Sequence, residues 1–334
     1  KTEEAVGQVL GHDITQIIPG VTKDAVFRKG HIITKEDIPV LLSVGKEHIY
    51  IWEKDEHMLH ENEAAQILYE MCRNEHMHPS AVKEGKIELI ADCDGLFKVD
   101  REKLRKVNSL GEMMIATRHG NTFVKKGDKL AGTRIIPLVI EKEKMERAKE
   151  ICNDGSILEI RPLQPKKAAI LTTGSEVYHG RITDKFTPVV KAKLEEVGME
   201  VLGNVLCDDD SQMVTDAINE WIAKGAEFVV CTGGMSVDPD DRTPLSIRNA
   251  TDEVITYGAP VLPGAMFMLA YKGEIPVAGL PGCVMYARRT IFDLVLPRIA
   301  AGERLSVEDF TVLGEGGLCL NCEVCTYPNC GFGK

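Results

Sequence analysis

A short apolar run that breaks into two glycines most constrains what this chain can fold into. Residues 228–232 read FVVCT, a β-branched and aromatic pattern typical of a buried strand, and Gly233-Gly234 follows directly. Paired glycines let the backbone turn sharply at the carboxyl end of a strand, the edge where open α/β sheets bind ligands. Their N–H groups suit an anion, and three carboxylates that suit a divalent cation come next, namely Asp238, Asp240 and Asp241. Taken alone, the stretch is equally well explained as a solvated turn.

The second half of the chain alternates strands with helices. Strands are predicted over 168–172, 199–206, 228–232 and 276–279, and helices over 187–197, 212–223 and 283–299. This alternation predicts an α/β domain over 166–302 with a doubly wound, mostly parallel sheet, because parallel strands need crossover connections.

The first half has a different pattern. Residues 1–165 predict a β-rich α+β module, with helices over 61–73 and 101–108 and strands over 49–52, 87–91 and 97–99. Asp100 is the expected cap of the second of these helices. No glycine-rich nucleotide loop occurs in this half.

Four sharp turns follow strands of the predicted parallel sheet: Thr173-Gly174-Ser175-Glu176, Asp208-Asp209-Asp210, Gly233-Gly234 and Leu280-Pro281-Gly282. Because the carboxyl ends of parallel strands meet at one edge, we expect the turns to lie together. They bring carboxylates from Glu176, Asp208 and Asp241 beside backbone donors. That combination suits Mg²⁺-dependent chemistry on a phosphorylated ligand.

Composition excludes two classes of partner. Acidic residues outnumber basic ones by 51 to 40, a net charge of -11, so binding to a nucleic-acid backbone is not expected. No apolar stretch approaches the roughly 18–20 residues of a membrane helix, and no signal-peptide core is present at the start of the sequence. We therefore expect a cytoplasmic protein without a membrane partner.

Four of the ten cysteines fall within residues 303–334, a short Cys-rich tail. Cys319, Cys322, Cys325 and Cys330 have the spacing C-x2-C-x2-C-x4-C, a metal-ligand pattern. The spacing is closer to half of a ferredoxin than to the separated pairs of structural zinc sites. An iron–sulfur cluster, Zn²⁺ and a metal-free flexible tail all remain open.

The four turns together resemble a known family. TTGSE after the first strand, VLCDDD, TGGMS followed by DDRTP, and the LPG turn are similar, in order and spacing, to the molybdopterin-binding domain of molybdenum cofactor biosynthesis proteins. The amino-terminal half more loosely resembles the MoeA-type molybdenum insertase, in AVGQVLGHDI and FRKGHII.

This resemblance implies a function and a set of site residues. Molybdopterin, or its adenylylated form, would lie along the sheet edge with Mg²⁺, and molybdate would be inserted as the adenylyl group leaves, a transferase reaction in a homo-oligomer such as a homodimer. The residues implied in catalysis are Asp241, Asp208 and Glu176. Those implied in ligand binding are Thr173, Gly174, Ser175, Gly233, Gly234, Ser236, Pro281 and Gly282.

Three departures from the family pattern keep other functions open. Cys283-Val284 follows the LPG turn in place of Asn-Pro, Ser175 replaces an acid, and Asp238-Pro239 replaces a glycine and its neighbour. The first alternative is a non-catalytic carrier or redox-sensing accessory protein that docks on a molybdoenzyme through the tail. The second is a nucleotide-handling enzyme on the same fold, because a fold does not fix its ligand.

Overall fold

The computed structural model describes residues 1–18, 22–51, 55–239 and 241–334. Asp240 and the end of the strand predicted over 49–52, at Trp52, lie outside these residues. The chain forms two compact units. The first comprises Lys1–Ile90, Asp100–Arg118 and Lys129–Glu159, and the second comprises Ala91–Val99, His119–Asp128 and Ile160–Lys334. In the described part of the chain, no helix is long and apolar enough to cross a membrane.

The first unit opens with a small antiparallel structure. It contains a 3-10 turn (Thr2–Glu4), β1 (Ile14–Ile18) paired with β2 (Thr22–Phe27), and α1 (Asp37–Ser43). Its core is formed by buried aliphatic residues, among them Leu10, Ile14 and Leu41. Of the strand predicted over 49–52, the described residues form only an isolated bridge between Ile51 and Leu10.

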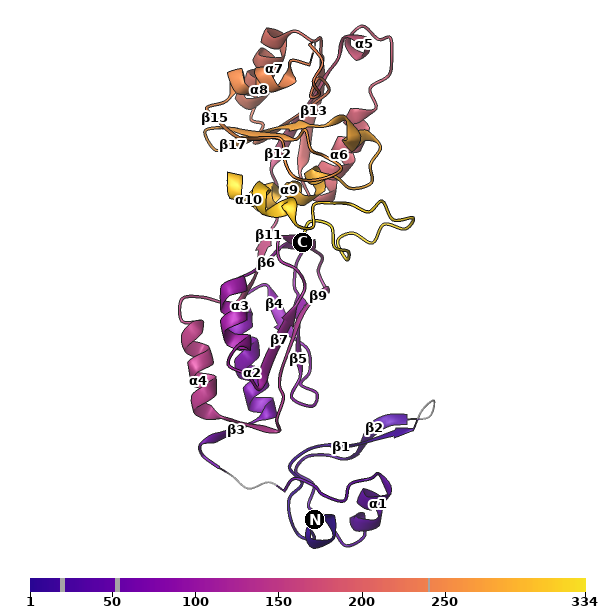
Figure 1. The fold of residues 1–334 in the computed structure, drawn as a ribbon, viewed down its shortest axis with the longest axis vertical. Helices are drawn as coiled ribbons and strands as arrows, with labels where there is room; N and C mark the ends of the chain where they lie inside the picture. The colour runs from indigo at the N-terminus through magenta and orange to yellow at the C-terminus, as the bar shows by residue number, and fades with distance from the viewer. Residues whose placement is uncertain (19–21, 52–54, 240) are drawn as a thin grey trace. The chain divides into compact units, whose positions relative to one another are not determined.

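The rest of the first unit is an antiparallel sheet covered by helices (Figure 1). The strand order is β4-β5-β9-β7, and a separate pair is formed by β3 and β10. The bounds are β3 Met58–His60, β4 Met77–Pro79, β5 Ile87–Ala91, β7 Met113–Thr117, β9 Lys129–Ile135, β10 Val139–Glu141, α2 Glu61–Cys72, α3 Arg101–Asn108 and α4 Lys142–Ile151. The helices predicted over 61–73 and 101–108 are confirmed, and Asp100 caps α3 by accepting from the N–H of Lys103 at 2.9 Å. The β-rich α+β module is therefore present.

The second unit is built on a six-stranded sheet in the order β13-β12-β14-β17-β16-β15. The first four of these strands run parallel to one another, and β16 runs antiparallel to both β17 and β15. The bounds are β12 Lys167–Thr173, β13 Glu200–Cys207, β14 Phe228–Thr232, β15 Glu253–Tyr257, β16 Met268–Lys272 and β17 Ile275–Leu280. The predicted doubly wound, mostly parallel sheet is confirmed.

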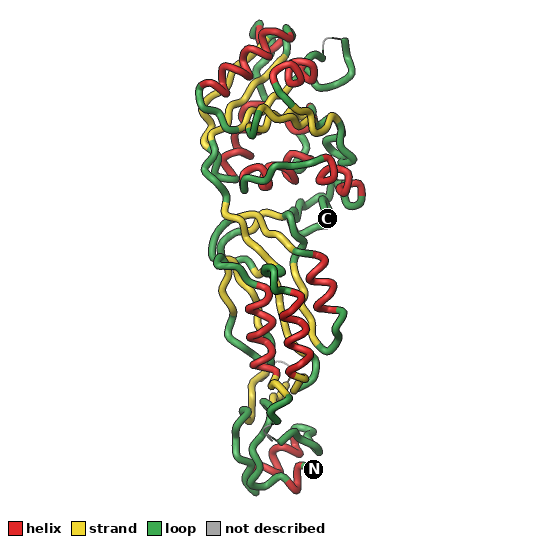
Figure 2. The backbone as a smooth tube through the Cα atoms, turned by 90° about the vertical axis from the view of Figure 1, so that its left-hand side faces the viewer, coloured by secondary structure: helices red, strands yellow, loops and turns green. Residues whose placement is uncertain are grey.

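Helices cover both faces of this sheet (Figure 2). Successive residues of a strand point to opposite faces, so Ile170 and Val230 pack with α6 and α9, whereas Leu171 and Val229 pack with α7 and α8. This arrangement explains why the strands are apolar throughout, and β14 is buried along its whole length. The helices are α5 Ser175–Tyr178, α6 Phe186–Glu196, α7 Ser211–Ala223, α8 Thr243–Ala250, α9 Ile291–Ala300 and α10 Val307–Thr311.

The helix predicted over 283–299 is wrong at its start. A 3-10 turn spans Gly282–Met285, and α9 begins only at Ile291. Thr290 and Asp293 form a capping box that fixes this start. The Thr290 hydroxyl accepts from the N–H of Phe292, and the Asp293 carboxylate accepts from the N–H of Thr290.

A small three-stranded sheet, β11-β6-β8, joins early segments of the chain to the second unit. Its strands are β6 Gly95–Val99, β8 Thr122–Val124 and β11 Leu158–Pro162, the last of which begins in the first unit. A 3-10 turn, Val312–Gly314, follows α10 and leads into the tail.

Candidate functional site

The four predicted turns lie at one edge of the second sheet. They follow β12, β13, β14 and β17, and those strands are mutually parallel. The prediction that they share an edge is confirmed.

The turn after β12 is held against its neighbours. Thr173 is buried, and its hydroxyl lies 3.0 Å from that of Thr243 at the start of α8. The N–H of Gly174 donates to the carbonyl of Cys207 at the end of β13, at 3.2 Å. The N–H of Ser175 donates to a carboxylate oxygen of Asp209 at 2.9 Å. Glu176 is exposed on α5, so its carboxylate is accessible to a ligand.

Three consecutive aspartates after β13 have three different roles. Asp208 is half-buried; one of its oxygens accepts from the N–H of Asp209 at 2.9 Å, and the other lies 3.4 Å from Nε2 of His179. Asp209 holds the turn after β12 through Ser175. Asp210 caps α7, accepting from the N–H of Met213 at 2.7 Å. Asp208 is therefore the member of the run whose carboxylate is least committed to shaping the backbone.

The glycine turn after β14 lies directly against the turn after β12. Gly233 and Gly234 have φ values of +83° and +54°, a left-handed conformation that favours glycine. A Cβ atom on Gly233 would lie 2.1 Å from the carbonyl oxygen of Thr173, and one on Gly234 would lie 2.7 Å from the hydroxyl of Thr243. Side chains are thus excluded here, because the glycine turn packs closely against Thr173 and Thr243.

Asp241 closes the loop that the glycines begin. Its carboxylate accepts from the N–H of Asp238 at 3.1 Å, and its own N–H donates to the carbonyl of Asp238 at 2.9 Å. Asp241 is half-buried, whereas Ser236 is exposed at the tip of the loop. Of the three aspartates noted in this loop, Asp240 lies outside the described residues.

The turn after β17 supplies shape rather than polar groups. Pro281 is buried and Gly282 is exposed, and the carbonyl of Pro281 accepts from the N–H of Val284 at 3.0 Å. Burial raises the pKa of the Cys283 thiol, so it is protonated at neutral pH and is not an activated nucleophile.

Asp184 is a residue of this edge that sequence reasoning missed. Its carboxylate accepts from the N–H groups of Phe186 and Thr187 at 2.8 and 3.1 Å and from the hydroxyls of Thr172 and Thr187 at 3.2 and 2.5 Å. It thereby ties the start of α6 to the end of β12. The signal was an aspartate placed three residues before Thr187 and Pro188, a pattern that often starts a helix.

The acids of the edge do not converge on a single point. Among the described residues, no three His, Cys, Asp or Glu side chains lie close enough together to hold a metal ion. Glu176, Asp208 and Asp241 share the edge but remain on separate turns, so a cation bound there would draw further oxygen ligands from the substrate.

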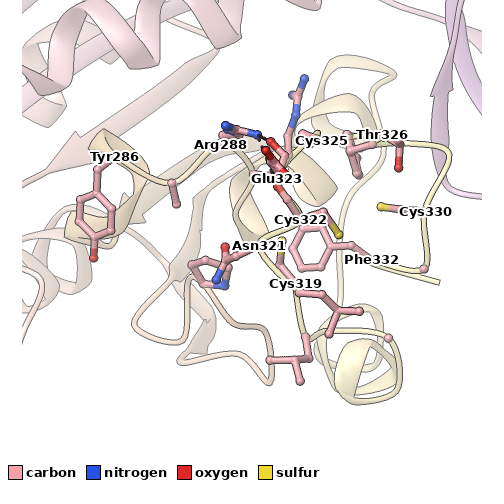
Figure 3. Close-up of a pocket in the computed structure, with 18 residues that line it drawn as sticks. Tyr286, Arg288, Cys319, Asn321, Cys322, Glu323, Cys325, Thr326, Cys330 and Phe332 are labelled. Atoms are coloured by element: carbon pink, nitrogen blue, oxygen red, sulfur yellow. Dashed lines mark hydrogen bonds between the residues drawn. The ribbon is translucent and has the colours of Figure 1, made fainter.

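The Cys-rich tail is folded onto the second unit rather than extended. Phe332 is buried, and Cys319, Tyr327 and Cys330 pack against the same hydrophobic core. The hydroxyl of Tyr327 donates to the carbonyl of Asp293 at 3.0 Å. The four tail cysteines line one cavity (Figure 3).

Comparison with known families agrees with the edge just described. Residues 169–301 match the family described as a probable molybdopterin binding domain. This part of the chain is therefore similar in sequence to molybdopterin-binding domains. Residues 1–53 match a domain of unknown function (DUF8806). The MoeA-like interpretation of the amino-terminal half therefore remains a prediction.

Curated relatives align with only part of the chain. A CinA-like protein of Pseudothermotoga lettingae is 32% identical over 85 residues, which cover 25% of this chain and 21% of the relative. A CinA-like protein of Chlorobaculum tepidum is 32% identical over 82 residues, covering 25% and 19%. The chain thus spans about a fifth of the length of the curated relatives it matches.

Solved structures are also similar to part of the chain. MoaB of Thermus thermophilus, a molybdopterin biosynthesis enzyme, aligns with a TM-score of 0.37 and 22% identity, covering 41% of this chain and 98% of that one. MoaB of Pyrococcus furiosus, a tungsten cofactor synthesizing protein, aligns with a TM-score of 0.32 and 24% identity, covering 36% and 84%.

Proposed function

We propose that the edge formed by the four turns binds molybdopterin or its adenylylated form together with Mg²⁺, in molybdenum cofactor biosynthesis. The observation that carries this proposal is the tight turn at Gly233 and Gly234, in a segment that matches the molybdopterin-binding family. A Cβ at either glycine would collide with Thr173 or Thr243, and the backbone N–H groups of such a glycine turn can donate to a phosphate group.

In this proposal each part of the edge has a task. The phosphate end of the ligand is surrounded by the turns after β12 and β14, through Thr173, Gly174, Ser175, Gly233, Gly234 and Ser236. The opposite side of the binding site is shaped by Pro281 and Gly282. Glu176, Asp208 and Asp241 provide oxygens for Mg²⁺, which prefers carboxylates combined with phosphate oxygens and water. The cation would neutralise negative charge on the phosphate oxygens.

Asp241 is the residue to test first. Asp241→Asn keeps an oxygen that accepts from the N–H of Asp238 but removes the negative charge. We expect it to weaken binding of adenylylated molybdopterin by about tenfold or more, equivalent to roughly 1.4 kcal/mol, when the ligand is titrated in the presence of Mg²⁺. Asp216→Asn is the control, because Asp216 is an exposed acid on α7. This variant should bind adenylylated molybdopterin as tightly as the wild type does.

Removing Mg²⁺ shows whether Asp241 binds the cation or only supports the conformation of its loop. If Asp241 acts through the cation, chelation should weaken ligand binding by the wild type and change little for Asp241→Asn. Chelation and the substitution both remove the same contact, the one between the Asp241 carboxylate and the cation. Equal losses on chelation in both proteins, or unchanged affinity in Asp241→Asn, would contradict the role of Asp241.

The full proposal includes catalysis in the cytoplasm by a homo-oligomer. Molybdate would be inserted at the dithiolene as the adenylyl group leaves, so incubation with adenylylated molybdopterin and molybdate should release AMP and yield molybdenum bound to the pterin in equal amounts. Binding without AMP release would exclude the insertase reaction. Sedimentation at several protein concentrations tests the homodimer.

A second function is favoured by the apolar surface of the tail. Leu320 and Val324 are 78% and 74% exposed beside the tail cysteines, an arrangement that suits docking to another protein. In this case the protein carries the cofactor to a molybdoenzyme, with a cluster or Zn²⁺ in the tail reporting redox state. A Leu320→Glu, Val324→Glu variant should then bind molybdopterin normally but fail to activate a cofactor-free molybdoenzyme.

A further inference from the structure

The four tail cysteines surround a single cavity of the second unit. The cavity has a volume of about 730 Å³, and Cys319, Cys322, Cys325 and Cys330 all contribute to its wall. Figure 3 shows the labelled cysteines spread around this space together with Phe332. Thiol groups that are close in sequence therefore also face one volume.

Both ends of the cysteine segment are held by the folded protein. The N–H of Cys319 donates to the carbonyl of Leu262 at 2.8 Å, and the N–H of Leu262 donates to the carbonyl of Gly317 at 2.8 Å. At the other end, Phe332 is 4% exposed within the core, and the N–H of Gly333 donates to the carbonyl of Gly316 at 2.9 Å. Cys319 and Cys330 are therefore positioned by backbone hydrogen bonds and core contacts of the second unit.

The two middle cysteines lie on a short exposed segment between these anchors. Cys322 and Cys325 are exposed. The guanidinium of Arg288 donates to the carbonyl oxygens of Glu323 at 2.7 Å and Cys322 at 3.5 Å. This contact holds the segment beside the cavity that its two cysteines line.

The spacing of the four cysteines favours one of two kinds of metal centre. A zinc ion takes four thiolates at about 2.3 Å from one atom, and structural zinc sites usually draw them from separated C-x2-C pairs. An iron–sulfur cluster binds its four thiolates around a polynuclear core. The run C-x2-C-x2-C-x4-C resembles half of a ferredoxin, and the cavity of about 730 Å³ that the four residues line has room for such a core.

We infer that Cys319, Cys322, Cys325 and Cys330 ligate one iron–sulfur cluster in this cavity. Each thiol loses its proton to solvent on binding iron, and iron and sulfide come from cluster assembly. The site is independent of molybdopterin binding, because it uses none of the residues assigned to the sheet edge.

The surroundings of the cavity suit an anionic cluster. Arg288 and Arg289 both line it. Arg289 is ion-paired with Asp293 at 2.9 Å, whereas Arg288 contacts backbone carbonyls of the cysteine segment. Arg288 thus places positive charge beside the cluster, which favours the reduced state because reduction adds an electron.

Reconstitution of the full chain tests the cluster. The protein is incubated anaerobically with ferrous iron and sulfide and then desalted, and iron, acid-labile sulfide and zinc are measured with the visible spectrum. The wild type should retain stoichiometric iron and sulfide with broad visible absorption that bleaches on reduction. The Cys322→Ser, Cys325→Ser variant should lose them, and since both residues are exposed, its folding should be unchanged.

Two comparisons make the result decisive. Cys93→Ser replaces a half-buried cysteine outside the cavity and should retain the cluster. Arg288→Ala should retain it with a more negative midpoint potential. The inference is overturned if the wild type keeps no more iron than the double variant, if it binds zinc and no iron, or if Cys93→Ser loses iron to the same extent.

Discussion

Gly233 shows how one missing side chain shapes the candidate site. The residue has a left-handed backbone, and its Cα faces the carbonyl of Thr173 so closely that an added Cβ would lie 2.1 Å from that oxygen. Neither backbone can retreat easily, because both belong to the ends of paired central strands. The close approach of β12 and β14 at this edge therefore depends on glycine.

Gly233→Ala should lower both stability and ligand affinity. A left-handed alanine costs roughly 1–2 kcal/mol, and the clash with Thr173 adds about 1–3 kcal/mol of strain. Gly198→Ala is the matched control, since Gly198 also has a positive φ of +74° but has no atom within 4 Å of an added Cβ. Urea unfolding of both variants isolates the clash, and equal losses of unfolding free energy would show that the approach to Thr173 does not matter.

At the scale of elements, the aspartate run after β13 connects two helices to the sheet edge. Asp209 fixes the start of α5 through the N–H of Ser175, and Asp210 fixes the start of α7 through the N–H of Met213. The two carboxylates are neighbours in sequence, yet they stabilise different elements. Their replacement should therefore affect different properties.

Asp210→Ala should cost about 1 kcal/mol of unfolding free energy, as expected for loss of an N-cap, without changing molybdopterin affinity. Asp209→Ala should instead weaken ligand binding, because the turn that carries Ser175 and Glu176 loses its restraint. Urea unfolding and ligand titration of both variants check this separation. A loss of affinity in Asp210→Ala equal to that in Asp209→Ala would mean that the whole run acts as one unit.

The same elements show what sequence could and could not predict. The turns were placed correctly, because strand periodicity and the geometry of parallel sheets decide which loops share an edge. The contacts of Asp208, Asp209 and Asp210 depend on loop conformation, so the separate roles of the three residues cannot be predicted from the sequence. The start of α9 was missed because residues 283–287 continue the apolar pattern, although the capping pair Thr290 and Asp293 marks the true start. The antiparallel strands β15 and β16 were also not predicted.

At the scale of the whole molecule, one buried acid joins distant parts of the chain within the second unit. Glu303 has an 8% exposed side chain and contacts Lys98 at 2.6 Å, Arg161 at 2.8 Å and Arg298 at 2.6 Å. These cations come from β6, β11 and α9, so the ion cluster fastens the small sheet to a helix of the main sheet. Glu303 is the acid that all three cations share, and Arg298 also pairs with Asp309 at 2.6 Å.

The pH dependence of stability should report this cluster. Burial alone would raise the pKa of Glu303, but hydrogen bonds and charge from Lys98 and Arg298 outweigh it, and the pKa lies below its ordinary value of 4.5. Because the pKa is lower in the folded state, the stabilisation is complete above pH 4.5 and is lost as the pH falls through the folded-state pKa.

Glu303→Gln should therefore destabilise the protein by roughly 1.5–3 kcal/mol at pH 7, where it removes the carboxylate charge that Lys98, Arg161 and Arg298 contact. The difference from the wild type should shrink as the pH falls below 4.5, since protonation then removes the same charge from the wild type. Glu274→Gln is the control, because Glu274 is 86% exposed in its pair with Arg304 and exposed pairs contribute little. Urea unfolding at pH 7 and at lower pH measures the effect. A loss that stays constant across this range would show that packing, rather than charge, is what Glu303 contributes.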